Sequence, residues 1–224
     1  MTENDQRLLA AAHGGDLAAA RAALADGARP EARDQQGRTP LLLAVLADAV
    51  PVAELLVAAG ADPDAQDDRQ DSAWLATGVT GSVPMLRALL PSRPDVGLTN
   101  RFGGVSLIPA AERGHVAYVR AVLAETDIDV DHVNRLGWTA LLEAVILGDG
   151  GRAHTEVVRL LLAAGATPDL PDADGVTPLR HAERRGFDAL AELLRPAPES
   201  APEPAPAPEP APAPAPVPEG GGSR

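Results

Sequence analysis

Short apolar runs recur along the chain at a nearly fixed interval, and each is followed by a second apolar run at helical spacing. The first runs start at Gln6, Thr39, Ser72, Val105, Thr139 and Thr177, so the intervals are 33, 33, 33, 34 and 38 residues. A fixed period of about 33 residues is typical of stacked arrays, in which each unit packs against its neighbours. The pattern therefore predicts one continuous stack of six similar units.

Each unit is predicted to contain two helices joined by a short turn. Thr39-Pro40 and Thr177-Pro178 place a hydroxyl cap before a proline at the first helical position, where the missing N–H costs nothing. Glycines that favour a left-handed cap are expected to end the first helices at Gly81, Gly114, Gly148 and Gly186. The second helices are expected at Val52–Ala59, Val83–Leu90, Val116–Ala124, Glu156–Ala164 and Phe187–Leu194.

Side chains that cap tight turns stand five residues before most helix starts. They are Asp34, Asp67, Asn100, Asn134 and Asp172. Aspartate and asparagine hydrogen-bond to the backbone just after them, so a tight turn is predicted at each position.

The unit Gly137–Asp169 departs most from the shared pattern. Asp149–His154 is an insertion, which is expected to form an extra loop between the two helices. Three glycines in and beside it, Gly148, Gly150 and Gly151, allow backbone N–H groups to converge on a small anion. The alternative is that the insertion is tolerated and has no function of its own.

The composition narrows the possible partners. The net charge is −13, and all 19 positive side chains are arginine. Nucleic-acid and anionic-membrane binding need clustered positive charge, so neither is expected. The N-terminus lacks the basic start and apolar run of a signal peptide, and no apolar run reaches the roughly 18–20 residues of a membrane span. A cytoplasmic location is therefore predicted.

The composition also indicates which residues fill the core and that the C-terminal segment differs from the rest of the chain. Aromatic residues make up only 2% of the chain, so alanine, leucine and valine must fill the core, and the absence of cysteine excludes disulfides. Residues 196–224 are rich in proline, alanine and glutamate and are predicted to be a disordered tail. A spacer is the favoured role for this tail, with a ligand for a proline-binding module as the alternative.

The repeated residues resemble those of the ankyrin repeat family. The similarity is carried by Gly37-Arg38-Thr39-Pro40-Leu41, Gly137-Trp138-Thr139-Ala140-Leu141, Gly175-Val176-Thr177-Pro178-Leu179 and the Gly60-Ala61-Asp62 type of ending. The resemblance implies an all-α solenoid of about six stacked helix-loop-helix units with short β-hairpin tips. The predicted domain covers residues 1–195, with repeats at 5–33, 34–66, 67–99, 100–133, 134–171 and 172–195.

The same resemblance implies that partners bind at the hairpin tips and the concave face of the first helices. The candidate partner-binding residues are Arg101, Phe102, Arg135, Leu136, Trp138, Asp149, Arg152 and His154. Trp and Arg dominate the energetics of protein interfaces, although Trp138 has the alternative of packing on its own hairpin. Trp74, by contrast, stands at a core position.

An unusual pair of polar residues occupies a position that is apolar in the other units. Four residues after the helix start, the units carry Ala10, Leu43, Ala76, Pro109, Glu143 and His181. A buried carboxylate needs a hydrogen-bonding partner. The first interpretation is that Glu143 accepts hydrogen bonds from the inserted loop and that His181 caps this network. The alternative is a small-ligand or metal site formed by Glu143, His154 and His181, although their spacing matches no metal motif.

These observations favour a non-catalytic protein–protein interaction module, acting as an adaptor or regulator. No P-loop, nucleophile elbow, zinc-protease or calcium-loop pattern occurs in the sequence. No catalytic residue, cofactor or metal is predicted, and the chain is expected to be a monomer with an unidentified protein partner. The alternative function is a ligand- or metal-binding regulator at Glu143, His154 and His181.

Overall fold

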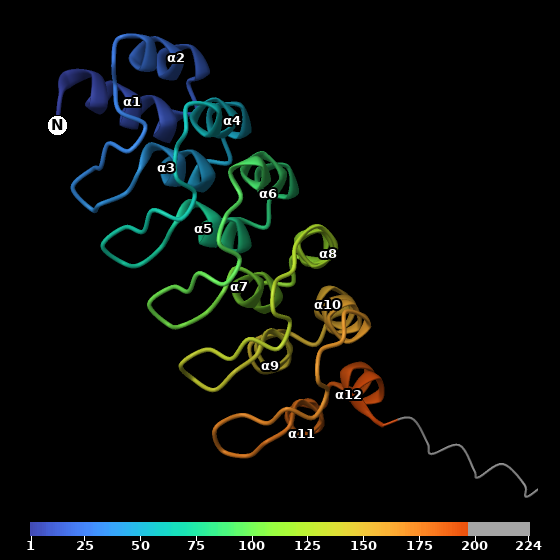
Figure 1. Ribbon diagram of the computed structural model, residues 1–224. Coiled ribbons are helices and arrows are strands. Elements are labelled where there is room, and N and C mark those ends of the chain that lie inside the picture. The colour runs from blue at the N-terminus through green and yellow to red at the C-terminus, as the bar shows by residue number, and fades with distance from the viewer. Residues whose placement is uncertain (197–224) are drawn as a thin grey trace, which may run out of the picture.

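The computed structural model describes residues 1–196, which form twelve α-helices and one short 3-10 helix (Figure 1). In chain order these are α1 (Glu3–Gly14), α2 (Leu17–Ala25), α3 (Pro40–Leu46), α4 (Val50–Ala58), α5 (Ala73–Thr80), α6 (Val83–Leu89), η1 (Leu90–Ser92), α7 (Leu107–Glu112), α8 (Val116–Glu125), α9 (Ala140–Ile146), α10 (Arg152–Ala163), α11 (Pro178–Arg184) and α12 (Asp188–Leu194). The predicted tail, apart from Pro196, lies outside the described residues.

The helices pair in sequence order and the six pairs stack. The odd-numbered helices α1 to α11 pack against one another in one layer, and the even-numbered helices α2 to α12 form a second layer behind them (Figure 1). Five loops, here called the tip loops, project from the first layer on the side away from the second (Figure 1). They contain residues 34–38, 67–71, 100–104, 134–138 and 172–176. The predicted all-α solenoid is confirmed.

Hydroxyl caps begin five of the six odd-numbered helices, including the two predicted at Thr39 and Thr177. One of the five is Thr2, before α1. The side-chain oxygens of Thr39, Ser72, Thr139 and Thr177 each accept a hydrogen bond from the backbone N–H three residues later. Such a bond satisfies one of the N–H groups that the helix itself leaves free.

Among the first helices of the pairs, two predicted starts are wrong. Helix α1 begins at Glu3 and not at Gln6, because Thr2 and Asp5 form a reciprocal capping box with bonds of 3.1 and 2.9 Å. Helix α7 begins at Leu107 and not at Val105, and Ser106 makes no capping bond. The fourth pair therefore starts late and has the shortest first helix, of 6 residues.

The insertion in the fifth pair is largely helical. Arg152, Ala153 and His154 form the first turn of α10, so this helix starts four residues before the predicted Glu156. The expected left-handed cap at Gly148 is also wrong, because the positive φ of 70° belongs to Gly150. Gly148 is required for a different reason, since a Cβ there would lie 2.2 Å from the carbonyl oxygen of Ala144.

The tip loops are closed by the predicted aspartate and asparagine side chains. In the fifth pair, Asn134 Oδ1 accepts from the backbone N–H groups of Leu136 at 2.9 Å and Trp138 at 3.0 Å. Asp34, Asp67, Asn100 and Asp172 make the corresponding pairs of bonds. No β-strand forms in residues 1–196, so the hairpin tips expected from the sequence are side-chain-closed turns without a strand ladder.

Small aliphatic side chains fill the space between the two layers. Alanine, leucine and valine supply most of the buried residues, and Trp74 and Tyr118 are the largest fully buried side chains. The core position predicted for Trp74 is therefore confirmed. No helix in residues 1–196 has the length and apolar character that crossing a membrane would require.

Candidate functional site

Exposed apolar side chains gather on one face of the stack. In residues 1–196 the exposed large hydrophobic residues are Met1, Leu46, Val79, Phe102, Val133, Leu136 and Leu147. Five of these seven, all except Met1 and Val133, line two grooves on the face formed by the tip loops and the helices α3, α5, α7 and α9. We call this surface the tip face. Exposed apolar surface gathered in one place marks interaction sites more often than scattered single residues do.

The two grooves occupy equivalent places in different pairs. The α3/α5 groove encloses about 290 Å³ and is lined by Gln36, Arg38, Leu42, Leu46, Asp67, Arg69, Asp71, Ala76 and Val79. The α7/α9 groove encloses about 210 Å³ and is lined by Asn100, Phe102, Gly104, Ile108, Pro109, Glu112, Asn134, Leu136, Glu143 and Leu147. Both grooves are open to the surface and are lined by polar and apolar side chains.

The predicted tip residues divide into exposed and half-buried ones. Phe102 is 53% exposed and Leu136 is 54% exposed, so both are available to a partner. Arg101 covers part of Phe102, with its guanidinium 4.5 Å from the ring centre, and Arg135 Nη1 donates to the carbonyl of Arg101 at 2.6 Å. Trp138 is only partly exposed, which favours the packing alternative for this residue.

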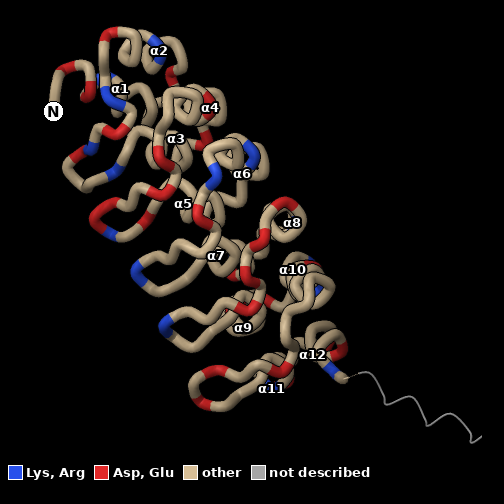
Figure 2. The backbone as a smooth tube through the Cα atoms, viewed as in Figure 1, with Lys and Arg blue, Asp and Glu red and all other residues tan. Residues whose placement is uncertain are grey.

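Charge differs from one tip loop to the next. The tip loops before α7 and α9 each carry one basic segment at their ends, whereas the tip loop before α11 carries only acidic ones (Figure 2). Arg101 and Arg135 are the basic residues of these two loops, and Arg101 also pairs with Asp71 of the preceding loop at 3.8 Å. The exposed apolar residues Phe102 and Leu136 therefore stand beside arginines that hold neighbouring tips together.

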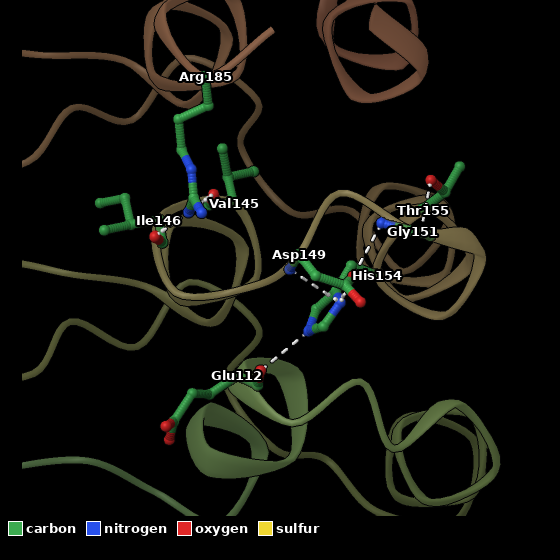
Figure 3. A network of polar contacts seen from close by, with 8 residues as sticks. All are labelled: Glu112, Val145, Ile146, Asp149, Gly151, His154, Thr155 and Arg185. Atoms are coloured by element: carbon green, nitrogen blue, oxygen red, sulfur yellow. Dashed lines mark hydrogen bonds and ion pairs between the residues drawn. The ribbon is translucent and has the colours of Figure 1, made fainter. Parts of the chain in front are cut away.

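The other predicted partner-binding residues lie elsewhere, at the connection between α9 and α10 (Figure 3). His154 is only 8% exposed. Its Nδ1 lies 2.7 Å from Asp149 Oδ1, and its Nε2 donates to the carbonyl oxygen of Glu112 at 2.9 Å. His154 is thus occupied inside the stack by Asp149 and Glu112, which leaves little of its side chain exposed to a partner, and its assignment to the partner-binding surface stays a prediction. Asp149 and Arg152 are exposed but do not line either groove.

The role of His154 is to join adjacent helix pairs. His115 makes the same contact one pair earlier, where Nε2 bonds to the carbonyl oxygen of Val79 at 3.1 Å. Arg185 does so one pair later, since Nη1 donates to the carbonyl oxygens of Val145 and Ile146. Carbonyls at a helix C-terminus have no partner within the helix. The insertion displaces His154 in the sequence and leaves its place in this ladder unchanged, which is why the sequence pattern did not reveal it.

Asp149 fixes the geometry of this connection. Its Oδ1 accepts from the backbone N–H of Gly151 at 2.8 Å as well as contacting His154. These bonds, with the one from Gly151 as the largest cause, lower the pKa of the Asp149 carboxyl below its ordinary value. Of the three glycines, only Gly151 donates to Asp149 among the described residues, so the predicted convergence of glycine N–H groups on an anion is not seen.

Replacing His154 by alanine is expected to lower the free energy of unfolding by about 1–3 kcal/mol, because the partly buried carbonyl of Glu112 loses its donor. Urea unfolding followed by circular dichroism measures this change. His13→Ala is the matched control, since His13 is exposed on α1 and should be nearly neutral. Equal stability of the two variants would contradict the inter-pair role.

Glu143 lies at the bottom of the α7/α9 groove and is only 5% exposed. Asn134 Nδ2 donates to its Oε1 at 2.9 Å. Burial, and to a smaller degree the nearby charge of Glu112, raise the pKa of the Glu143 carboxyl to about 7, while Asn134 and Arg113 act in the opposite direction. Glu143 is therefore a carboxyl group that changes its charge near neutral pH.

The predicted network of Glu143, the inserted loop and His181 is wrong. His181 Nε2 bonds to Asp172 Oδ2 at 2.7 Å, and Glu143 bonds to Asn134, so each side chain binds the turn-closing residue of its own pair. The turn-closing residue has opposite roles in the two bonds. The amide of Asn134 donates to Glu143, whereas the carboxylate of Asp172 accepts from the imidazole of His181. Helix geometry directs this position toward the tip loop and not toward the connection between the helices.

The hypothesis of a shared site at Glu143, His154 and His181 is also wrong. The three side chains have separate hydrogen-bond partners on different elements. Within residues 1–196, no three histidine, aspartate or glutamate side chains come together as a metal ion requires.

Comparison with known proteins agrees with the stack. A family model described as "Ankyrin repeats (3 copies)" matches residues 2–67 and 74–172. The ankyrin repeat protein YahD of Escherichia coli (strain K12) is 42% identical over 186 residues, which are 83% of this chain and 92% of YahD. A solved ankyrin repeat domain from Acinetobacter baumannii AYE is 46% identical, with a TM-score of 0.79 over 84% of this chain and 95% of that chain. The solved ankyrin repeat protein EF0377 is 34% identical, with a TM-score of 0.82 over 86% of this chain and 98% of that chain.

Proposed function

The chain belongs to the ankyrin repeat family, whose domains generally bind proteins, and from this premise we propose that it is a non-catalytic adaptor or regulator that binds a partner protein on the tip face. One observation carries the proposal. Five of the seven exposed large hydrophobic residues in residues 1–196 line the two grooves of this single face. The second layer of helices offers no comparable group among the same residues.

The centre of the proposed surface is the α7/α9 groove with Phe102 and Leu136 at its edge. A partner side chain that covers both would remove two large, half-exposed apolar residues from water. Burial of apolar area contributes about 25 cal/mol per Å², so such residues supply much of the affinity at the centre of an interface. Arg101 and Arg135 would lie around this centre and contribute to orientation.

The surface of the second layer carries salt bridges between neighbouring helices. Arginine and glutamate side chains pair between neighbouring even-numbered helices, at 2.8 Å for Arg87 with Glu125 and at 2.7 Å for Arg120 with Glu156. The charges of these residues are therefore paired within the stack. The exposed apolar residues of the tip face are not fully covered by the other residues of the described part of the chain, and this difference favours the tip face as the binding surface.

Replacing both Phe102 and Leu136 by alanine is expected to weaken partner binding by at least about tenfold, because both side chains would lose apolar contact area in the complex. Affinity purification with quantitative mass spectrometry would identify the partner with the unaltered chain. Titration calorimetry would then give the affinities of the variants.

Val133→Ala is the matched control for this experiment. Val133 is 48% exposed and lines neither groove, so its loss should leave the affinity near that of the unaltered chain. A partner that binds the double variant as tightly as the unaltered chain would rule out this surface.

A further inference from the structure

We propose that the α7/α9 groove receives an arginine side chain of the partner protein, with Glu143 as the carboxylate that pairs with its guanidinium. The proposal rests on the proposed function, because it assumes that a protein docks on the tip face. It adds the chemical feature by which that partner is recognised.

Glu143 is a buried carboxyl group without a positive partner. Its side chain is almost fully enclosed, and the only hydrogen bond to its carboxyl group within residues 1–196 is the neutral one from Asn134 to Oε1. No hydrogen bond from the described residues reaches Oε2. Removing a carboxylate from water without a counter-charge is unfavourable, and a bound cation relieves that cost.

The neighbouring charges make the groove selective for a cation. Glu112 is a second carboxylate in the groove wall. Arg113 is the nearby cation, but its Nη1 already bonds to Glu112 Oε2 at 2.9 Å. Arg101 pairs with Asp71 and Arg135 donates to a backbone carbonyl. Neither arginine lines the groove, whose lining includes the carboxyl groups of Glu112 and Glu143. The floor of the groove therefore remains acidic and complements a positive side chain.

The walls of the groove suit the remainder of an arginine side chain. Phe102, Ile108, Leu136 and Leu147 give an apolar surface along which its three methylene groups would pack. A volume of about 210 Å³ is that of one large side chain and not of a helix. Guanidinium groups are less strongly hydrated than ammonium groups and present several donors in a plane, so arginine is favoured over lysine for a partly buried carboxylate.

The α3/α5 groove provides an internal comparison. Ala76 stands four residues after the helix cap in that groove, where the α7/α9 groove has Glu143. The apolar residues Leu46 and Val79 are present there, but the buried carboxyl group is not. Asp67 and Asp71 line the α3/α5 groove, but Arg38 and Arg69 line it as well and Asp71 also pairs with Arg101. Within residues 1–196 no arginine lines the α7/α9 groove, so a partner's arginine would be favoured there.

Selection from a displayed library of randomised peptides on the full-length chain tests the proposal. The enriched peptides should carry an arginine flanked by apolar residues. In a synthetic enriched peptide, citrulline in place of that arginine should weaken binding at least about tenfold, because citrulline keeps the shape and loses the charge. Glu143→Gln should weaken the arginine peptide similarly and should abolish the difference between arginine and citrulline.

Glu54→Gln is the matched control, because Glu54 is exposed on α4 and carries the same charge outside the tip face. A library without arginine-dependent binders, or a citrulline peptide that binds as tightly, would overturn the inference. If binding depends on Phe102 and Leu136 but not on Glu143, the inference fails and the proposed function stands. If binding depends on none of the three, both fail.

Discussion

Replacing Gly78 by alanine is expected to lower the free energy of unfolding by about 3 kcal/mol. Gly78 lies in α5, and a Cβ at this position would come within 1.9 Å of the carbonyl oxygen and 2.7 Å of the carbonyl carbon of Ser106. These are backbone atoms, so no side-chain rotation can remove the overlap. The helix α5 would have to move away from the start of the fourth pair.

The cause of this close approach is the late start of α7. Ser106 has a helical backbone conformation and makes no capping bond, in contrast to Ser72 and Thr139 at the starts of α5 and α9. Its carbonyl therefore projects against the preceding helix. Val45 and Val145 occupy the position of Gly78 in other pairs, so the glycine compensates for an irregular neighbour and is not part of the shared pattern.

Urea unfolding of Gly78→Ala beside Gly14→Ala tests this account. Gly14 ends α1, and a Cβ added there would have no atom within 4 Å, so its replacement should be neutral or slightly stabilising. Alanine restricts the unfolded chain equally at both sites, and the difference between the variants therefore isolates the overlap with Ser106. A Gly78→Ala variant as stable as Gly14→Ala would show that α5 and α7 can separate without cost.

The parts of the fold that could be predicted from the sequence depend on contacts between near neighbours. A threonine cap and the N–H group that donates to it lie three residues apart, as Thr39 and Leu42 do, and a turn-closing residue such as Asn134 bonds within four residues. Such chemistry repeats with the period of the chain. The repeat pattern therefore predicted most first helices and all five tip loops.

The sequence pattern did not reveal contacts between distant residues. His154 bonds to a carbonyl 42 residues earlier, and Gly78 touches Ser106 of the next pair. Neither contact has a local signal. His154 and His115 have the same role in their pairs. The repeat pattern placed the whole insertion in the loop before the second helix, so it did not align His154 with His115.

The candidate site shows the same division. The unusual carboxyl at Glu143 and the exposed Phe102 and Leu136 were recognised from the repeat pattern, because each departs from it or stands at a tip. The partner of Glu143 was assigned wrongly, since proximity to the insertion suggested the loop while the helix directs the side chain to Asn134. How far Trp138 is exposed could be learned only from the structure, because its position in a loop does not show how much of the ring is covered.

Replacing Glu143 by glutamine is expected to raise the free energy of unfolding by about 3 kcal/mol at pH 8 and to leave it nearly unchanged at pH 4. The folded pKa of Glu143 is raised from 4.5 to about 7, so the folded state holds the proton more tightly than the unfolded state. The stability that this group contributes is therefore fully present below pH 4.5 and is lost as the pH rises through 7. Glutamine can still accept the hydrogen bond from Asn134 and has no charge to lose.

Urea unfolding from pH 4 to pH 8 would measure the difference between the variant and the unaltered chain, with Glu54→Gln as the control on the exposed face of α4. A flat difference for Glu143→Gln would contradict the raised pKa.

The result bears directly on function, because the same substitution is expected to stabilise the fold and to weaken binding of an arginine-bearing partner. Opposite effects of one substitution on stability and binding distinguish a residue kept for its partner from one kept for the fold. Glu143 would then belong to the first class, even though its hydrogen bond to Asn134 resembles the purely structural bond of His181 to Asp172.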